Sequence, residues 1–276
     1  MTLYLGIDGG GTGCRAAVAD ASGRVLGRGE AGPANIASDL AGAQANILAA
    51  AGQALAGSGI ALSALSAGLG LAGANAAGVA ARLRAGLPFT RLRIETDAVA
   101  AVKGALGDGD GIVAALGTGS VFARQRAGQI QQIGGWGLVL GDEGSGAWLG
   151  RALLSAVLAA VDGLGPVTPL LTQVLDDHGG KEGVIARSLA ARPADFAALA
   201  PGLWSSADPA ARSLLDRGTA HVAAAIAVLQ SDPPLPVSFI GGLGPAYAAR
   251  LADRWTILPA RGSALDGALL LAREAA

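Results

Sequence analysis

The sequence is poor in the residues that build disulfides, metal clusters and basic surfaces. Its 276 residues include one cysteine, Cys14, and two histidines, His178 and His221. A single cysteine excludes an internal disulfide and an iron–sulfur cluster held by one chain alone, and two isolated histidines disfavour zinc chemistry. The only lysines are Lys103 and Lys181, and the formal net charge is −1. We therefore expect no nucleic-acid partner.

Residues 40–81 carry no charge and are numerous enough to span a bilayer. The stretch is nevertheless broken by glycines, asparagines and glutamines and lacks a dense Leu/Ile/Phe core. We expect an alanine-rich helix near 38–56 and a buried strand near 65–71, and no membrane association. The chain starts directly with a strand-like LYLGID and shows no secretory signal, so the cytoplasm is the expected compartment.

Two segments share one pattern, in which a buried strand leads through a glycine loop into two further strands. The first copy has strands at 3–8, 14–20 and 24–30, and the second at 111–116, 121–126 and 129–134. Between the copies the pattern predicts helix 38–56, strand 65–71, helix 76–86 and strand 91–95. After them it predicts helices near 145–161, 168–178, 182–191, 194–199 and 207–230, a strand at 236–240 and a helix at 263–274. The duplication predicts two α/β domains, 1–106 and 107–262, with a final helix at about 263–276 packing back onto the first domain.

Both glycine loops have the composition of phosphate-binding loops. Backbone N–H groups can converge on an anion where glycines remove the interference of a Cβ, as Gly10 and Gly11 do before Thr12 and Gly119 does between Thr118 and Ser120. One such loop is more often an ordinary hairpin turn. Two copies favour a pair of loops that hold a polyphosphate from both sides of a cleft. The glycines lead into strands and no GxxxxGK[ST] occurs, so neither a P-loop nor a dinucleotide fingerprint is present.

Two aspartates end strands beside these loops. Asp8 closes the first strand, where a carboxylate can hold Mg²⁺ directly or through water, although it could also cap the turn. Asp97 lies between a strand and the helical AVAAVKGAL, a position suited to a catalytic base and equally to a helix N-cap.

A glycine-rich segment after the second loop contains an aromatic residue and two acids. Gly135 and Trp136 are followed by Asp142 and Glu143. A sugar ring can rest on the indole while the acids accept hydrogen bonds from its hydroxyls. The alternative is a cap for a helix starting near Ser145 together with a core tryptophan.

Two further positions have a ligand interpretation and an ordinary one. Asn35, after the first three strands, could fold over the same crevice or form a polar turn. Gly241 and Gly242 follow a strand-like PVSFI, where bare backbone would let an adenine ring lie flat, but a simple turn explains them almost as well.

The ordered motifs IDGGGT, GPAN, TDA, LGTGS, GGWGLVLGDEGSG and FIGGLG span nearly the whole chain. This set resembles the N-acetylglucosamine/glucosamine kinase group of the BadF/BadG/BcrA/BcrD ATPase family, within the actin/hexokinase/Hsp70 superfamily. The resemblance implies an α/β fold of two RNase H-like (actin-like ATPase) domains with a cleft between them. It also implies transfer of the γ-phosphate of ATP, with Mg²⁺, to the 6-hydroxyl of N-acetylglucosamine or glucosamine, and dimers are common among such relatives.

By the same resemblance Asp97 is the general base. Asn35, Gly135, Trp136 and Asp142 match positions that hold the sugar, and Thr12 and Thr118 match positions that contact the nucleotide phosphates.

Two other functions stay open. The same family includes ATPase activators of 2-hydroxyacyl-CoA dehydratases, which share a [4Fe–4S] cluster through two cysteines per chain; this sequence offers only Cys14. A kinase of another hexose is the second alternative. Residues 160–235 match no motif, so the contacts to adenine there are unassigned.

Overall fold

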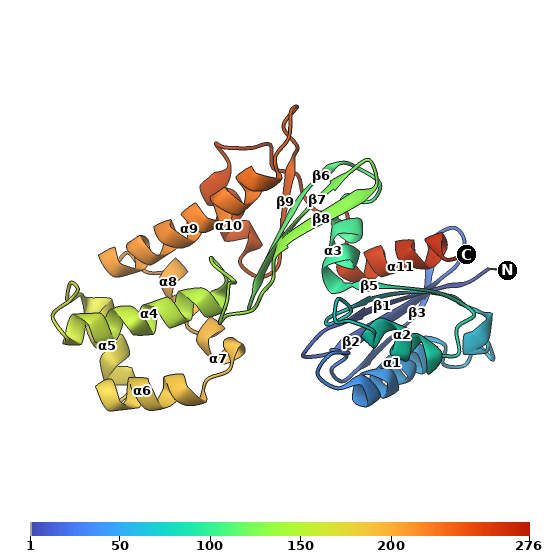
Figure 1. Ribbon diagram of the computed structural model, residues 1–276, viewed down its shortest axis with the longest axis horizontal. Helices are drawn as coiled ribbons and strands as arrows, with labels where there is room; N and C mark the ends of the chain where they lie inside the picture. The colour runs from blue at the N-terminus through green and yellow to red at the C-terminus, as the bar shows by residue number, and fades with distance from the viewer. Residues whose placement is uncertain (1) are drawn as a thin grey trace. The chain divides into compact units, whose positions relative to one another are not determined.

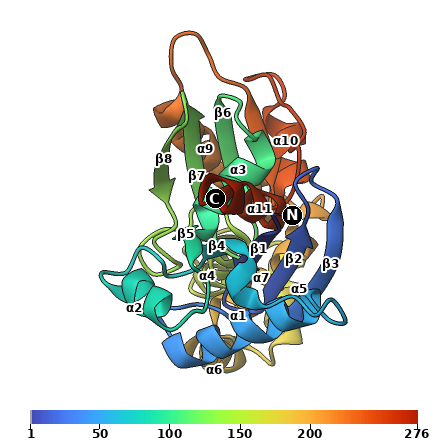
Figure 2. The ribbon, with the colours of Figure 1, turned by 90° about the vertical axis from the view of Figure 1, so that its right-hand side faces the viewer.

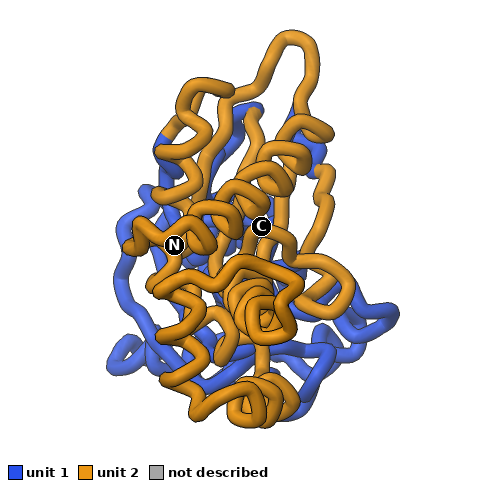
Figure 3. Tube along the Cα trace, turned by 90° about the vertical axis from the view of Figure 1, so that its left-hand side faces the viewer, with its two compact units in different colours: residues 1–110, 125–130, 259–276 blue, residues 111–124, 131–258 orange. Residues whose placement is uncertain are grey.

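The computed structural model describes residues 2–276, and Met1, the first residue of the predicted first domain, lies outside them. Two compact units are present (Figure 3): unit 1 comprises residues 1–110, 125–130 and 259–276, and unit 2 comprises residues 111–124 and 131–258. The domain bounds 1–106 and 107–262 stay a prediction.

Unit 1 is built on a five-stranded sheet of order β3-β2-β1-β4-β5 (Figure 2). Strands β1 (Tyr4–Gly9), β2 (Cys14–Ala19) and β3 (Val25–Ala31) are antiparallel, whereas β4 (Ser66–Leu71) and β5 (Arg91–Thr96) run parallel to β1. Leu5, Ile7 and Leu69 are fully buried, as expected of parallel strands covered on both faces. The carboxyl ends of β1, β4 and β5 meet at one edge of this sheet, because parallel strands end on the same side.

Helices cover the two faces of this sheet (Figure 1). Along β2, Ala16 and Val18 pack in the cluster that contains α1 (Leu40–Ala54), whereas Ala17 and Ala19 pack against α11 (Ala264–Glu274). Side chains of a strand alternate between faces, so α1 and α11 lie on opposite sides. Helix α3 (Asp97–Leu106) packs against α11, and α2 (Val79–Ala85) contacts β5 and α1. The C-terminal helix is thus part of unit 1.

A second, four-stranded sheet repeats this strand order as β8-β7-β6-β9; it belongs to unit 2 except for the tip of the β7–β8 hairpin, residues 125–130, which is part of unit 1. Its members are β6 (Gly111–Leu116), β7 (Ser120–Arg126), β8 (Gln129–Gly134) and β9 (Val237–Ile240), with β9 parallel to β6. A parallel bridge from Val237 to Ile257 stands where the fifth strand would lie. The internal duplication inferred from the loop pattern is therefore present in the topology.

A helical layer follows in unit 2. It consists of α4 (Gly146–Val161), α5 (Pro169–Asp177), α6 (Lys181–Ala190), α7 (Pro193–Ala197), α8 (Ala200–Trp204), α9 (Pro209–Leu229) and α10 (Gly244–Leu251). Helices α8 and α10 were not predicted, because each contains a turn-type pair, Pro201-Gly202 in α8 and Gly244-Pro245 in α10. None of the helices in the described part of the chain combines the length and sustained apolar character that a bilayer span requires.

Candidate active-site residues

The sheet register of unit 1 brings Asp8, the predicted Mg²⁺ ligand, and Asp97, the predicted general base, to one edge. Asp8 pairs across β1 and β4 with Gly70, and the next row joins Gly9 to Leu71 and Leu71 to Thr96. Asp97 follows Thr96 directly as the first residue of α3. The negative charge of Asp8 is close enough to contribute to a raised pKa at Asp97.

Asp97 does not serve as the helix cap. The cap of α3 is Thr96, whose hydroxyl oxygen accepts a hydrogen bond from the Val99 N–H at 3.2 Å. Thr96 is therefore the N-cap residue, and Asp97, the first residue of the helix, accepts a hydrogen bond from the Ala98 N–H through Oδ1 at 2.9 Å. The residue as a whole is solvent-exposed, yet protein around the carboxyl group desolvates it and raises its pKa, with Asp8 adding to the effect. A carboxylate with a raised pKa is a better proton acceptor than an ordinary aspartate.

Asp8 has a partner that the sequence analysis missed. Arg15 Nη2 contacts Asp8 Oδ2 at 2.5 Å, and the aspartate side chain is 12% exposed. The two residues are directly opposite in the β1–β2 hairpin, so the register across a short glycine turn could have revealed the pair. Arg15 thereby places a positive charge beside the first glycine loop.

The backbone of the first glycine loop is accessible to a ligand. The Gly10 N–H donates to the Gly13 carbonyl at 2.9 Å, which closes the turn. A Cβ added at Gly10 or Gly11 would meet nothing within 4 Å, so open space lies beside both residues. Thr12 is exposed. A phosphate can therefore approach this backbone directly.

Asn35 forms the polar turn that was its alternative. Its side-chain oxygen accepts hydrogen bonds from the Ala37 N–H at 3.0 Å and the Ser38 N–H at 3.3 Å. The next residue, Ile36, donates its N–H to Ala72 at the end of β4. Asn35 is thus held near the same sheet edge as Asp8, with its side-chain amide nitrogen as the group that could bind a ligand.

In unit 2 the second glycine loop packs against the start of α4. Gly146 donates its N–H to the Gly117 carbonyl at 2.8 Å, and Ala147 donates to Thr118 at 3.1 Å. Ser120 is buried and its hydroxyl donates to the Glu143 carbonyl at 3.0 Å. Thr118 itself is exposed, so its hydroxyl can meet a ligand.

The Gly241–Gly242 turn reaches the same strand end. The Leu243 N–H donates to the Leu116 carbonyl, the last residue of β6, at 3.0 Å. Gly241 has φ +84°, and a Cβ there would lie 2.4 Å from the Leu116 oxygen, so only glycine fits. Exposed backbone at Gly241 and Gly242 therefore lies beside the second glycine loop.

Asp142 lies directly against the second glycine loop. It is 9% exposed, and a Cβ on Gly119 would be 2.8 Å from Asp142 Oδ2. Burial raises the pKa of Asp142, the N–H groups of Ser120 and Gly137 oppose that rise, and Glu143 adds to it. Its φ of +61° is uncommon for a residue with a side chain. The backbone is thus held in a conformation that directs this carboxyl group toward the loop.

Trp136 is not a core residue, because 70% of its surface is exposed. It follows Gly135, whose N–H donates to the Ser120 carbonyl at 3.0 Å. The helix cap that was part of the alternative is present but belongs to Ser145, whose hydroxyl accepts from the Trp148 N–H at 3.1 Å. Trp136 therefore has no structural role in the core and is free to contact a ligand.

A second missed residue is Tyr247 of α10. Its hydroxyl donates to the Gly144 carbonyl at 2.7 Å, and the side chain is fully buried. It thereby connects the helix after the Gly241–Gly242 turn to the segment carrying Asp142. No motif indicates this bond, since its partners are 103 residues apart.

No cluster of three or more His, Cys, Asp and Glu side chains suited to a metal ion exists within residues 2–276. Magnesium in phosphoryl transfer is held by one or two carboxylates together with the phosphates of the nucleotide. A lone carboxylate such as Asp8, beside a glycine loop, suits an ion that arrives with its nucleotide.

The chain resembles two full-length proteins that carry kinase names. It is 31% identical over 287 residues to "Glucosamine kinase GspK" of Vibrio cholerae, covering 99% of this chain and 96% of the relative. It superimposes on the structure of a candidate N-acetylglucosamine kinase from Chromobacterium violaceum with a TM-score of 0.87 and 34% identity, covering 99% of both chains.

A dehydratase activator has the same fold, with a lower sequence identity and a lower TM-score than the kinase structure. Component A of the (R)-2-hydroxyglutaryl-CoA dehydratase of Acidaminococcus fermentans matches with a TM-score of 0.51 and 13% identity, over 100% of this chain and 99% of that one. This similarity shows the two-domain actin-like fold alone.

The model of the BadF/BadG/BcrA/BcrD ATPase family matches residues 5–235, which include both glycine loops, Asp97 and Asp142. Together with the full-length relative, this match establishes that the chain belongs to the BadF/BadG/BcrA/BcrD ATPase family.

Proposed function

We propose that this protein is an ATP-dependent sugar kinase that phosphorylates the 6-hydroxyl of glucosamine or N-acetylglucosamine. The observation that carries the proposal is the position of Asp97: it stands on the same sheet edge as Asp8 and the first glycine loop, and another residue caps its helix. The full-length relatives named as amino-sugar kinases support the same substrate class.

In the proposed reaction Asp97 accepts the proton of the sugar hydroxyl as its oxygen bonds to the γ-phosphorus of ATP. The bond from that phosphorus to the bridging oxygen breaks, and ADP leaves with the electron pair. The raised pKa of Asp97 brings its basicity closer to the operating pH, which is the condition under which a general base is most effective.

Asp8 is the residue that would hold Mg²⁺. Oδ2 contacts Arg15, so we assign Oδ1 to the ion, directly or through water. Bound there, Mg²⁺ would neutralise charge on the transferring phosphate. Arg15 would hold the carboxylate in place from its other oxygen, and the backbone at Gly10, Gly11 and Thr12 would bind phosphate oxygens.

The proposed roles in unit 2 follow from what each group can donate or accept. The exposed Thr118 hydroxyl and the backbone at Gly119 would contact nucleotide phosphates, and the bare backbone at Gly241 and Gly242 would face the adenine. Ser120, predicted for the same role, has its hydroxyl on the Glu143 carbonyl and its N–H on Asp142, so it would instead hold the loop in shape. Trp136 offers an apolar plate, and Asp142 an acceptor for sugar hydroxyls. Asn35 and Gly135 complete the proposed set of sugar contacts.

An activator function is the alternative from another class. It would need cysteine thiolates for a cluster, but Cys14 is 1% exposed and burial, with the charge of Asp8, raises its pKa to about 12. A thiol of that kind stays protonated and inaccessible. This favours the kinase, which we place in the cytoplasm because the proposed reaction consumes ATP.

The test is sugar-dependent release of ADP in a coupled assay with glucosamine, N-acetylglucosamine, glucose and N-acetylmannosamine. We expect stimulation by one of the first two and a product phosphorylated at O6, identified by ³¹P and ¹³C NMR. Asp97→Asn should lower kcat by about 100-fold or more, the scale of general-base loss, while binding of ATP is kept. Asp108→Asn, at an exposed position of the same unit, is the matched control.

Stimulation by none of the four sugars would reject the kinase. Near wild-type turnover of Asp97→Asn would reject Asp97 as the base.

A further inference from the structure

A cavity of about 260 Å³ lies in unit 1 among the end of α3, the start of α11 and the turn after β2. The residues that line it include Gly23, Lys103, Gly107, Arg261, Asp266 and Arg273. Three of these side chains are cationic in a chain with 20 lysines and arginines and 21 acids. Positive charge is thus concentrated at a site to which neither the motifs nor the proposed reaction assigns a role.

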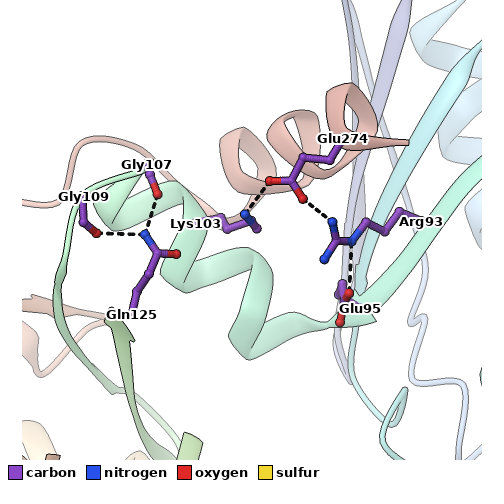
Figure 4. Close-up of polar contacts among 7 residues, drawn as sticks. All are labelled: Arg93, Glu95, Lys103, Gly107, Gly109, Gln125 and Glu274. Atoms are coloured by element: carbon purple, nitrogen blue, oxygen red, sulfur yellow. Dashed lines mark hydrogen bonds and ion pairs between the residues drawn. The ribbon is translucent and has the colours of Figure 1, made fainter. Parts of the chain in front are cut away.

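Each of the three cations is placed by its surroundings. The Lys103 side chain is only 12% exposed, and its ammonium pairs with Glu274, which also contacts Arg93 (Figure 4). Arg273 lies over the ring of Tyr4 at 5.6 Å. Arg261 is exposed, and its guanidinium lies beside the turn after α3, with Nη1 3.3 Å from a Cβ position on Gly107 and Nη2 3.3 Å from one on Gly109. The three positive groups therefore lie around one cavity.

The side chains of Arg261 and Arg273 are available to bind an anion. Ion pairs at up to 4.0 Å are found in eight places within residues 2–276, and neither Arg261 nor Arg273 takes part in any of them. Asp266 also lines the cavity, but its Oδ2 already accepts hydrogen bonds from the backbone N–H and the hydroxyl of Ser263, both at 2.7 Å. Asp266 therefore caps α11, and within residues 2–276 it forms no ion pair with either arginine.

The carbonyl groups at the end of α3 are also satisfied. Carbonyl oxygens at a helix C-terminus repel an anion. Gln125 donates its side-chain amide to the carbonyls of Gly107 and Gly109, at 2.7 and 2.8 Å (Figure 4). Gly107 is the C-cap of α3 and Gly109 lies in the turn after it, so these two bonds satisfy carbonyl groups that follow the helix beside the cavity.

The cavity is separate from the candidate active-site residues of unit 1. Ala19, which lines it, pairs with Tyr4 at the beginning of β1, whereas Asp8 and Gly9 lie at the end of that strand. Gly107 is ten residues after Asp97, which corresponds to about 15 Å along α3 at 1.5 Å per residue. A ligand in the cavity would therefore not occupy the position proposed for the sugar or the Mg²⁺.

We propose that this cavity is a binding site for a phosphate group, carried by a small phosphomonoester or as free phosphate. Guanidinium groups bind phosphate oxygens through paired N–H donors, so Arg261 and Arg273 would make the main contacts. The Lys103 ammonium, paired with Glu274, lies at the same cavity. Water occupies about 30 Å³ per molecule in the liquid, so the volume admits a phosphate with a few attached carbon atoms. This site goes beyond the proposed kinase activity and does not depend on it.

Isothermal titration calorimetry with inorganic phosphate and with glycerol 3-phosphate tests the site. The protein is kept saturated with Mg·ADP, so that the glycine loops are not available to the probes. We expect one saturable site in the wild type and binding at least tenfold weaker, about 1.4 kcal/mol, in the double variant Arg261→Gln/Arg273→Gln. Raising the ionic strength should weaken wild-type binding.

The double variant Arg84→Gln/Arg187→Gln removes two exposed arginines elsewhere and is the charge-matched control. Its affinity should equal that of the wild type. Equal affinity of wild type and Arg261→Gln/Arg273→Gln, or no saturable binding of either probe, would overturn the proposal. If the melting temperature of the double variant falls, the single variants take its place, each with a several-fold loss expected. Tighter binding of glycerol 3-phosphate would identify a monoester as the ligand, and equal affinity of the two probes would identify free phosphate.

Discussion

Alanine at position 104 would force two helices of unit 1 apart. Gly104 lies inside α3, and a Cβ there would be 1.9 Å from the Ser263 carbonyl oxygen and 2.6 Å from its carbon. Ordinary contact begins near 3.4 Å, and both obstacles are backbone atoms that cannot rotate away. Gly267 of α11 approaches equally closely, with a Cβ position 1.9 Å from the Ala100 oxygen. The methyl group therefore requires the helices to separate.

Two effects of opposite sign determine how much Gly104→Ala changes the free energy of unfolding. Replacing glycine by alanine inside a helix stabilises it by about 1 kcal/mol. Overpacking typically costs about 1–3 kcal/mol, and a rigid backbone contact on both helices puts Gly104→Ala at or above the upper end. We expect a net loss of about 2 kcal/mol. Because α3 also carries Asp97, kcat should fall as well.

Gly52→Ala is the matched control. Gly52 lies inside α1, is exposed, and has nothing within 4 Å of its Cβ position, so the same substitution should stabilise by up to about 1 kcal/mol. Urea unfolding should be followed by circular dichroism, since all four tryptophans lie in unit 2 and report on it. A Gly104→Ala protein as stable as the wild type would refute the close contact of α3 with α11.

Three further predictions concern the carboxyl groups of Asp97 and Asp142 and the hydroxyl group of Tyr247. The raised pKa of Asp97 predicts that the wild-type rate declines on acidification at a higher pH than an ordinary aspartate would allow, and that the folded state loses stability as pH rises through the shifted pKa. Asp97→Asn should thus be at least as stable as wild type at pH 7 in urea. Tyr247→Phe leaves the Gly144 carbonyl without its donor and should cost about 1–3 kcal/mol, measured by tryptophan fluorescence in urea. Asp142→Asn should raise the sugar KM by about 10–100-fold and leave the ATP KM unchanged in steady-state kinetics.

Each of these three predictions would be contradicted by a specific result. A clear loss of stability in Asp97→Asn would mean that the carboxylate stabilises the fold rather than strains it. Unchanged stability of Tyr247→Phe would show that its hydroxyl bond contributes nothing. A higher ATP KM in Asp142→Asn would assign that residue to the adjacent glycine loop instead of the sugar.

Most strands and long helices were predictable because their signals are local. The strand–loop–strand pattern around GGGT and GTGS depends on glycine conformation and on alternation within a few residues, and the structure has both meanders. The roles of the candidate site residues were harder to predict from the sequence. Whether Asp97 capped its helix depended on the competing hydroxyl of Thr96, and whether Trp136 entered the core depended on the exposure of its loop, which short-range patterns do not specify.

The duplicated α/β plan, the two glycine loops and the candidate aspartates follow from the amino-acid sequence, because turn chemistry and apolar periodicity act over a few residues. Which distant residues meet depends on the packing of the folded chain. Tyr247 reaches Gly144 across 103 positions, and Lys103 shares a cavity with Arg261 and Arg273 from the other end of the chain. The sequence likewise treats Gly104 and Gly52 alike, whereas the packing of α11 against α3 makes the first irreplaceable. Contacts of this kind depend on how helices pack on a sheet, which no local pattern encodes.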